Sequence, residues 1–412
     1  MRPVTAGGAE RAWCLYDWGN SAFAAVCMTA LLPPYLAGLA NDELGAPAGT
    51  AVWGWTAALG LLAGVLLAPL LGALADARAW RLRLLATFAI AGAAATALLA
   101  LALPASWRTG AALYVVAATG FATANVFYDA LLPGLGPPTR WDAISARGYA
   151  YGYAGGGLAL AGAAALAMVG GKAAIPWAFL LAAVWWLLFT LPVLRGVREP
   201  AAVGAGGAFA RLRETARHAR AHPVLWRFLL AYWVYNDGIG TVIKMAGAYG
   251  AELGIPLGHM LGALLLTQAV GVPATLAFGR LGARLGAKRG IQAALAGYVA
   301  IALLGVFMRV AWHFWLLAGL VGVVQGGAQA LSRSLYARLL PAGREAEFFS
   351  FFDVSGRMAG IAGPALFAVL TTWFGTGRAG VAAVLSFFVL GLWLLSGVDV
   401  PSEGSERPRP GL

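Results

Sequence analysis

Residues 51–74 read AVWGWTAALGLLAGVLLAPLLGAL, a run without a charged side chain. A helix needs about 20 predominantly apolar residues to cross the hydrocarbon core of a bilayer, so this run is long enough to span a membrane. The rest of the chain has the same character, because 60% of its 412 residues are hydrophobic and only 11% are charged. An average soluble protein carries about 25% charged residues. The composition therefore indicates an integral membrane protein of the all-α class.

Similar apolar runs recur along almost the whole chain, and we expect twelve membrane-spanning helices. The expected spans are residues 12–39, 51–74, 82–103, 110–132, 147–170, 174–194, 223–250, 257–280, 289–308, 312–334, 347–373 and 377–398.

The net charge of +12 would suit a nucleic-acid partner in a soluble protein, but its distribution indicates a membrane topology. Most of the 29 Lys and Arg residues fall in the termini and in every second loop. Loops rich in Lys and Arg stay in the cytoplasm, which predicts that both termini are cytoplasmic and that the number of spans is even. We therefore expect the lipid bilayer as a partner and no nucleic acid.

One long polar connection, residues 195–222, divides the expected spans into six and six. It predicts an N-terminal bundle at residues 1–194, a cytoplasmic linker, a C-terminal bundle at residues 223–398 and a disordered tail at residues 399–412. Within the linker, His218 and His222 have a spacing that can chelate a metal, but no Glu lies between them and no third ligand is near. We expect no metal, no cofactor and a monomer.

Two loop segments repeat between the halves: Gly72-Ala-Leu-Ala-Asp76-Ala-Arg78-Ala-Trp-Arg81 after the second span, and a second copy at residues 279–289 after the eighth. Both resemble the loop signature of the major facilitator superfamily, although the second copy has Ala283 at the acidic position. The resemblance implies two six-helix bundles that work by alternating access around a central cavity. A carboxylate and several Arg across the cytoplasmic helix ends can form a breakable gate.

The chain most resembles one branch of that superfamily, the vacuole-effluxer-like transporters. The resemblance depends on Trp13-Cys-Leu-Tyr-Asp17-Trp-Gly-Asn20-Ser21-Ala-Phe, with Pro33-Pro34-Tyr35 closing the same helix, and on Tyr235-Asn236-Asp237-Gly238. Fungal members are thought to release amino acids from vacuoles, which implies an amino acid-like solute. The Ala-, Gly- and Arg-rich composition indicates a bacterial chain, and hence a protein of the bacterial cytoplasmic membrane.

Polar side chains inside the first and seventh spans are the main candidates for the site. An ionisable side chain at membrane depth costs roughly 2.5 kcal/mol or more, so it usually faces a cavity and has a function. Asp17, Asn20 and Ser21 share one helical face, and so do Asp237, Thr241 and Lys244. The predicted substrate or proton site comprises Asp17, Asn20, Ser21, Asn125, Tyr235, Asn236, Asp237, Thr241, Lys244, Gln325 and Gln329. The predicted cytoplasmic gate comprises Asp76, Arg78, Asp129, Arg284, Arg333, Asp353 and Arg357.

A carboxyl group buried in a membrane can bind a proton and release it when water arrives, or bind a cationic group. A zwitterionic solute held between an acidic and a basic group would suit Asp237 and Lys244, and Asp17 and Asp237 are candidates for proton coupling. The alternative, purely structural interpretation of the two carboxylates is a buried hydrogen bond between helices. For Asp129, Arg333, Asp353 and Arg357 it is an interfacial ion pair.

Three other functions remain alternatives at this point. The segment at residues 148–157 is similar to the Gly-rich signature of drug/proton antiporters, but Tyr153 stands where that signature has Pro, and small residues also serve close helix packing. A membrane enzyme is disfavoured, because the sequence has neither a His-Glu-x-x-His motif nor a phosphate-binding loop. A channel or scaffold would show no dependence on buried carboxylates.

Overall fold

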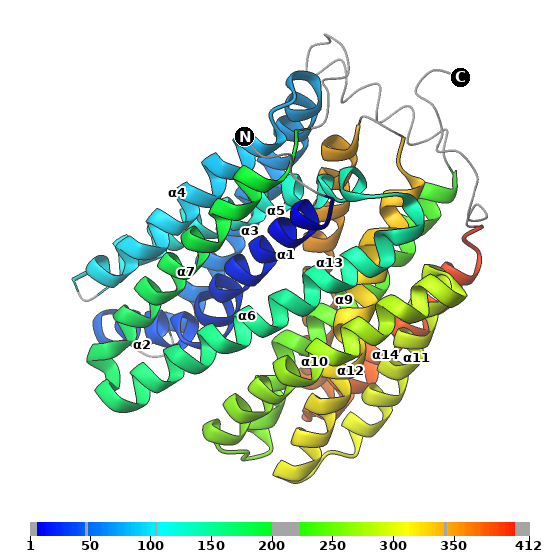
Figure 1. Ribbon diagram of the computed structural model, residues 1–412. Coiled ribbons are helices and arrows are strands. Elements are labelled where there is room, and N and C mark those ends of the chain that lie inside the picture. Colours follow the sequence, from blue (N-terminus) through cyan, green and yellow to red (C-terminus); the bar gives the residue numbers. More distant parts are fainter. Residues whose placement is uncertain (1–5, 46–47, 104, 200–222, 342–343, 400–412) are drawn as a thin grey trace. The chain divides into compact units, whose positions relative to one another are not determined.

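The computed structural model describes residues 6–45, 48–103, 105–199, 223–341 and 344–399. The predicted linker and tail, with His218 and His222, lie almost entirely outside the described residues. In the described part the regular structure is all helical (Figure 1). The helices before residue 200 are α1 (Ala6–Ala22), a π-helical segment (Phe23–Ala30), α2 (Leu32–Leu44), α3 (Ala48–Arg78), α4 (Arg81–Ala102), α5 (Trp107–Ala130), α6 (Trp141–Gly170) and α7 (Ile175–Gly196). Those that follow are α9 (Pro223–Glu252), α10 (Leu257–Leu285), α11 (Ala287–Val306), α12 (Ala311–Leu339), α13 (Glu345–Phe374) and α14 (Gly377–Ser396).

Eight helical stretches of the described chain are long and apolar enough to cross a membrane, or nine if the bent pair of α1 and α2 forms one span. One of the eight runs from Pro138 to Gly196 and contains both α6 and α7. α9 is not among them, and it carries Asp237 and Lys244 in its interior. The number of twelve spans and the cytoplasmic position of the termini therefore stay predictions.

The first expected span is not one straight helix. The chain bends by 42° between Ala30 and Leu32. Pro33 and Pro34 lie in the first turn of α2, where a missing backbone N–H breaks no helical hydrogen bond. The two prolines therefore begin the next helix, and the expectation that they close the first one is wrong.

Contacts divide the chain into two compact units. The first comprises residues 1–135 and 151–209, and the second comprises residues 136–150 and 210–412. α6 thus contributes its first ten residues to the second unit and its remainder to the first. The predicted division into residues 1–194 and 223–398 stays a prediction.

The same helix pairs recur in both units. In the first unit α1 packs on α7, α3 on α5, and α4 on both α5 and α7. In the second unit α9 packs on α14, α10 on α12, and α11 on both α12 and α14. When α1 and α2 are counted together as one bent span, these are the same pairs. The repeated loop segments at residues 72–81 and 279–289 therefore lie at equivalent places in two sets of helices that pack alike.

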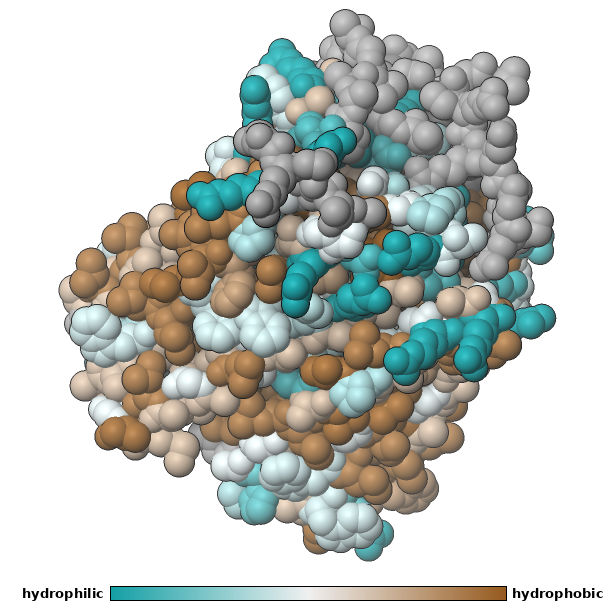
Figure 2. All heavy atoms as spheres, in the orientation of Figure 1, coloured by the Kyte–Doolittle hydropathy of each residue, from teal (hydrophilic) through white to brown (hydrophobic). Residues whose placement is uncertain are grey.

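Large apolar side chains are exposed along the helices of both units. Examples are Leu66, Leu101, Trp177, Leu304 and Trp393. In Figure 2, brown and pale residues cover most of the visible flanks, and teal residues are few on them. A soluble protein rarely exposes apolar surface on this scale, whereas a lipid-facing helix requires it.

Candidate functional site

In the first unit, the polar face of α1 contacts α5. The Nδ2 atom of Asn20 donates a hydrogen bond to Oδ1 of Asn125 at 2.6 Å. The hydroxyl of Tyr128, one turn further along α5, donates to Oδ2 of Asp17 at 3.1 Å. The structure thus brings Asp17 and Asn20 to Asn125 as a set, and it adds Tyr128, which the sequence did not single out as a site residue.

Trp13 of α1 holds Tyr128 in place. In the predicted topology, Trp13 lies on the cytoplasmic side of Asp17. The ring of Trp13 stacks on that of Tyr128 with the centroids 4.4 Å apart, and the indole N–H of Trp13 donates to the carbonyl of Tyr128 at 2.9 Å. Both residues are fully buried. The hydroxyl of Tyr128 is therefore aimed at Asp17 by a rigid aromatic pair, which orients a polar group better than a mobile side chain can.

The other side of Asp17 and Ser21 is covered by Gly152 of α6. A Cβ atom on Gly152 would lie 2.8 Å from Oγ of Ser21 and 3.4 Å from Oδ1 of Asp17. Gly155, one turn later, lies against the backbone of Trp18 so closely that a Cβ would overlap the carbonyl oxygen. Close packing on α1 therefore accounts for at least these two glycines of the Gly-rich segment.

In the second unit, Asp237 of α9 occupies the corresponding position. The side chain is 2% exposed. The backbone N–H of Gly363 in α13 donates to its Oδ2 at 2.9 Å, whereas its Oδ1 is buried and has no hydrogen-bond partner among the described residues. Thr241, one turn along α9, is also buried, and its hydroxyl donates to the carbonyl of Asp237 at 2.7 Å.

Gly363 approaches α9 as Gly152 approaches α1. A Cβ atom on Gly363 would overlap Oγ1 of Thr241 and would lie 2.8 Å from Oδ1 of Asp237. Pro364 follows it inside α13. In both units, a carboxylate and a hydroxyl four residues later on the first helix lie against a glycine, which belongs to α6 in the first unit and to α13 in the second. We call these two clusters the carboxylate–glycine contacts: Asp17, Ser21 and Gly152, and Asp237, Thr241 and Gly363.

The remaining predicted site residues lie around the second contact. The hydroxyls of Tyr235 and Ser332 of α12 are hydrogen-bonded at 2.6 Å, and Nδ2 of Asn236 donates to the carbonyl of Gly356 at 3.2 Å. Gln325 and Gln329 are half-buried and share a face of α12 with Ser332. The hydroxyl of Ser332 connects this face to Tyr235 of α9. Lys244 is exposed.

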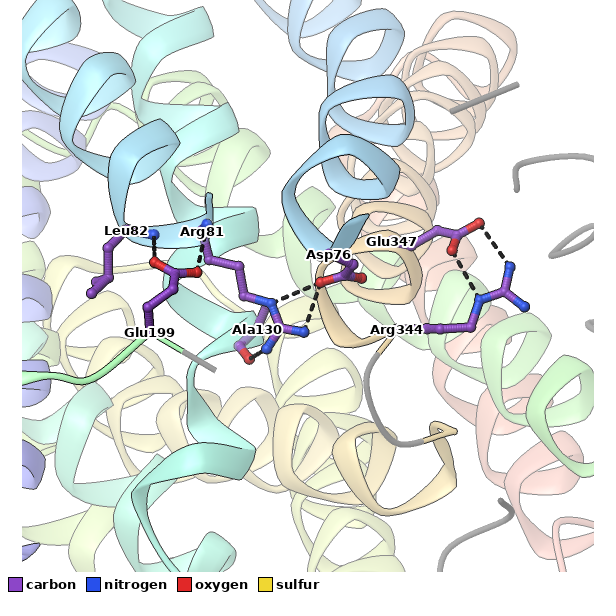
Figure 3. A network of polar contacts seen from close by, with 7 residues as sticks. All are labelled: Asp76, Arg81, Leu82, Ala130, Glu199, Arg344 and Glu347. Atoms are coloured by element: carbon purple, nitrogen blue, oxygen red, sulfur yellow. Dashed lines mark hydrogen bonds and ion pairs between the residues drawn. The ribbon is translucent and has the colours of Figure 1, made fainter. Parts of the chain in front are cut away.

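Among the predicted gate residues of the first unit, Asp76 forms an ion pair with Arg81. The Nη2 and Nε atoms of Arg81 both lie 2.7 Å from Oδ1 of Asp76, and Arg81 also donates to the carbonyl of Ala130 at 3.3 Å (Figure 3). Arg78 is exposed and lies over the ring of Trp80 at 4.8 Å. The carboxylate of Asp76 therefore pairs with Arg81, the last arginine of the loop segment. Asp129 is half-buried.

Glu199 covers the other side of Arg81 (Figure 3). Its two carboxylate oxygens accept the backbone N–H groups of Arg81 and Leu82 at 2.8 and 2.7 Å, so it caps the N-terminus of α4. Burial raises the pKa of the Glu199 carboxyl above its ordinary value, although these two hydrogen bonds and the charge of Arg81 act in the opposite direction. The sequence did not identify this cap, because Glu199 is far from α4 in the chain.

In the second unit, Arg333 of α12 is 2% exposed and binds the first turns of α6. Its Nε and Nη2 atoms donate to Oγ and the carbonyl of Ser145 at 2.8 and 2.9 Å, and its guanidinium lies over the ring of Tyr149 at 4.4 Å. One turn away, Oδ1 of Asp142 accepts hydrogen bonds from Ser334 and Arg338. Arg333 was among the predicted gate residues, whereas its neighbours Asp142, Ser145 and Arg338 were not.

The other predicted gate residues of the second unit are Arg284, Asp353 and Arg357. Arg284 is exposed and Asp353 is half-buried. The side chain of Arg357 lies outside the described residues. A buried pair close to Asp353 in sequence, Arg344 and Glu347, was not predicted: Nε and Oε2 are 3.0 Å apart, as drawn in Figure 3.

Replacing Arg333 by Met is expected to lower the free energy of unfolding by about 2 kcal/mol, because Ser145 loses two charge-assisted hydrogen bonds in a buried position. Thermal unfolding of the purified protein in detergent measures the effect. Arg284→Met, at an exposed position, should stay within about 0.5 kcal/mol of the wild type. Equal stability of the two variants would contradict a structural role for the Arg333 hydrogen bonds.

Comparisons with known proteins agree with this architecture. The family model described as "Vacuole effluxer Atg22 like" matches residues 47–407. A relative from Bacillus subtilis, named uncharacterized MFS-type transporter YxiO, is 36% identical over 96% of this chain and 95% of its own length. Autophagy-related protein 22 of Saccharomyces cerevisiae is 26% identical over 70% of this chain and 66% of its own length.

Among solved structures, the human organic anion transporter MFSD10 has a similar fold, with a TM-score of 0.77 at 19% identity, over 96% of this chain and 100% of that one. The match shows the fold alone. Together with the family match it establishes that the protein is a membrane transporter and not an enzyme. The chain belongs to the Atg22-like vacuole effluxer family of the major facilitator superfamily.

Proposed function

We propose that the protein moves a small polar or zwitterionic solute, amino acid-like in its chemistry, across the membrane by alternating access, with protons as the coupling ion. The observation that supports this most directly is Asp237. Its carboxylate is almost fully buried, Oδ2 is paired with the N–H of Gly363, and Oδ1 has no partner in the described part of the chain.

An ionised carboxylate with an unpaired oxygen is costly to keep out of water. The cost falls when the oxygen binds a proton or the ammonium group of a solute, and the group becomes charged again when water reaches it. Asp17 is placed for the same chemistry in the first unit, where it is half-buried and accepts the hydroxyl of Tyr128. Two such carboxylates give the transporter one for the proton and one for the solute.

An amino acid-like solute fits the positive charge on α9, which can hold the carboxylate of the solute while Asp237 carries the proton. Lys244 lies two turns beyond Asp237, about 10 Å along the helix axis, and is an exposed residue. A zwitterion presents one group of each sign. The family description, vacuole effluxer, is consistent with export of such a solute.

The drug/proton antiporter alternative depends on the Gly-rich segment of α6. Gly152 and Gly155 both pack against α1, so close helix packing explains these glycines without an antiport function. We therefore favour a small polar solute. We also propose that the protein works as a monomer in the bacterial cytoplasmic membrane.

Counterflow and uptake in proteoliposomes test the proposal, with a panel of amino acids, peptides and cationic drugs, each with and without an imposed pH gradient. We expect counterflow of at least one amino acid, and accumulation of it only when a pH gradient is present. Asp17→Asn should impair one of these two activities. The matched control is Asp42→Asn, the same change at an exposed position of α2. Transport of drugs but of no amino acid would overturn the solute assignment.

A further inference from the structure

A groove of about 300 Å3 lies in the second unit between the start of α9 and the end of α14. Arg227 and Leu230 line it from α9, and Trp393, Leu394, Ser396 and Gly397 line it from the end of α14. It is formed by the two helix ends that the charge distribution places at the cytoplasmic membrane surface. Its described lining contains none of the predicted site or gate residues.

The walls of the groove are apolar and open. Trp393 is 69% exposed and Leu230 is 45% exposed. Tryptophan is enriched where a membrane protein meets the headgroup region, because its ring is amphipathic. Apolar walls of this kind, on helices whose flanks face lipid, suit the first carbons of an acyl chain and disfavour a water-soluble ligand.

The charge at the groove is positive. Arg227 is exposed, and its guanidinium can bind a phosphate in a bidentate manner. The last carbonyls of α14 would ordinarily repel an anion, since a helix C-terminus carries partial negative charge. Here the ammonium of Lys288 binds the carbonyls of Ser396 and Val398 at 2.8 Å each, which offsets that charge. Asp399, two residues beyond Gly397, is the acidic residue nearest in sequence.

We propose that this groove binds the headgroup of an anionic phospholipid of the cytoplasmic leaflet, with Arg227 on the phosphate and Trp393 and Leu230 beside the glycerol and upper acyl chain. Basic pockets between membrane-spanning helices on the cytoplasmic side are suited to such headgroups. The inference is independent of the solute and of proton coupling, because it uses none of the same residues.

Native mass spectrometry of the full chain in detergent measures the binding, with phosphatidylglycerol as the probe and phosphatidylcholine of the same acyl chains as the reference. We expect phosphatidylglycerol to bind about fivefold to tenfold more tightly, as one added cationic contact allows. Arg227→Gln should reduce this preference to about one. Arg378→Gln, at the opposite end of α14, should leave it unchanged, and Asp399→Asn should leave it equal or larger.

Leu230→Trp is the second variant, because it fills the groove and keeps Arg227. It should also abolish the preference for phosphatidylglycerol. If Arg227→Gln does not fold, this variant alone tests whether the groove binds the lipid. Retention of the preference in a folded Arg227→Gln or Leu230→Trp protein would overturn the proposal. So would equal affinity for the two lipids. Binding of glycerol 1-phosphate as tight as that of phosphatidylglycerol would instead identify a site for a soluble phosphate, and would likewise overturn it.

Discussion

Replacing Asp237 by asparagine is expected to abolish proton-driven accumulation of the solute while counterflow continues. Asparagine keeps the size of the side chain and can still accept the N–H of Gly363, but it cannot bind and release a proton. With one proton coupled to one solute, a gradient of one pH unit supports about a tenfold accumulation, since one unit corresponds to about 1.4 kcal/mol. In Asp237→Asn this accumulation should fall to the level seen without a gradient.

The measurement is solute accumulation in proteoliposomes at several imposed pH gradients, with counterflow measured on the same preparation. Asp42→Asn is again the control. If Asp237→Asn lost both activities, Asp237 would bind the solute itself, and proton coupling would be assigned to Asp17. If Asp17→Asn and Asp237→Asn both behaved as the wild type under every gradient, the assignment of both carboxylates would be wrong.

Gly363→Ala is expected to destabilise the protein by about 3 kcal/mol and to impair transport strongly. The added Cβ would overlap Oγ1 of Thr241 and crowd Oδ1 of Asp237, so α13 must move away from α9 and the hydrogen bond to Oδ2 is lost. Thermal unfolding in detergent and counterflow together measure the effect. Gly240→Ala on α9 is the matched control, because nothing lies within 4 Å of its added Cβ.

A second substitution separates crowding from a general intolerance of alanine in α13. Thr241→Ala removes the hydroxyl that the new Cβ would overlap, so the double variant should be more stable than Gly363→Ala alone. Such non-additivity is expected for residues in direct contact. An additive loss in the double variant would show that the approach of Gly363 to Thr241 is not the cause.

Sequence periodicity predicted the polar faces well, because residues three and four apart on a helix must share a face. Asp17 and Asn20 do share one, and Asn125 does meet Asn20. Close helix packing was one predicted interpretation of the Gly-rich segment at residues 148–157, but the carboxylate that each glycine meets was not predicted. Which residue of α6 or α13 approaches a given carboxylate depends on the rotation and tilt of two separate helices, and a single sequence carries no record of either.

The partner of Asp76 shows a second limit. The loop segment offers two arginines after Asp76, namely Arg78 and Arg81. α3 ends at Arg78, and Ala79 turns the chain with a φ of 54°, in the left-handed region. α4 then begins at Arg81, whose side chain reaches back to Asp76. The turn at Ala79 positions Arg81 for this ion pair, and an alanine gives no sequence signal for such a turn.

The carboxylate–glycine contacts also constrain how this family can diverge. In each contact, the hydroxyl on one helix fills the volume that the missing side chain of the glycine leaves on the other. Positions 21 and 152 are therefore expected to vary together among relatives, and so are positions 241 and 363, with a larger residue at one tolerated only beside a smaller residue at the other. Within each of these two pairs, the summed volume of the two side chains would then stay nearly constant among relatives, although the residues are distant in sequence.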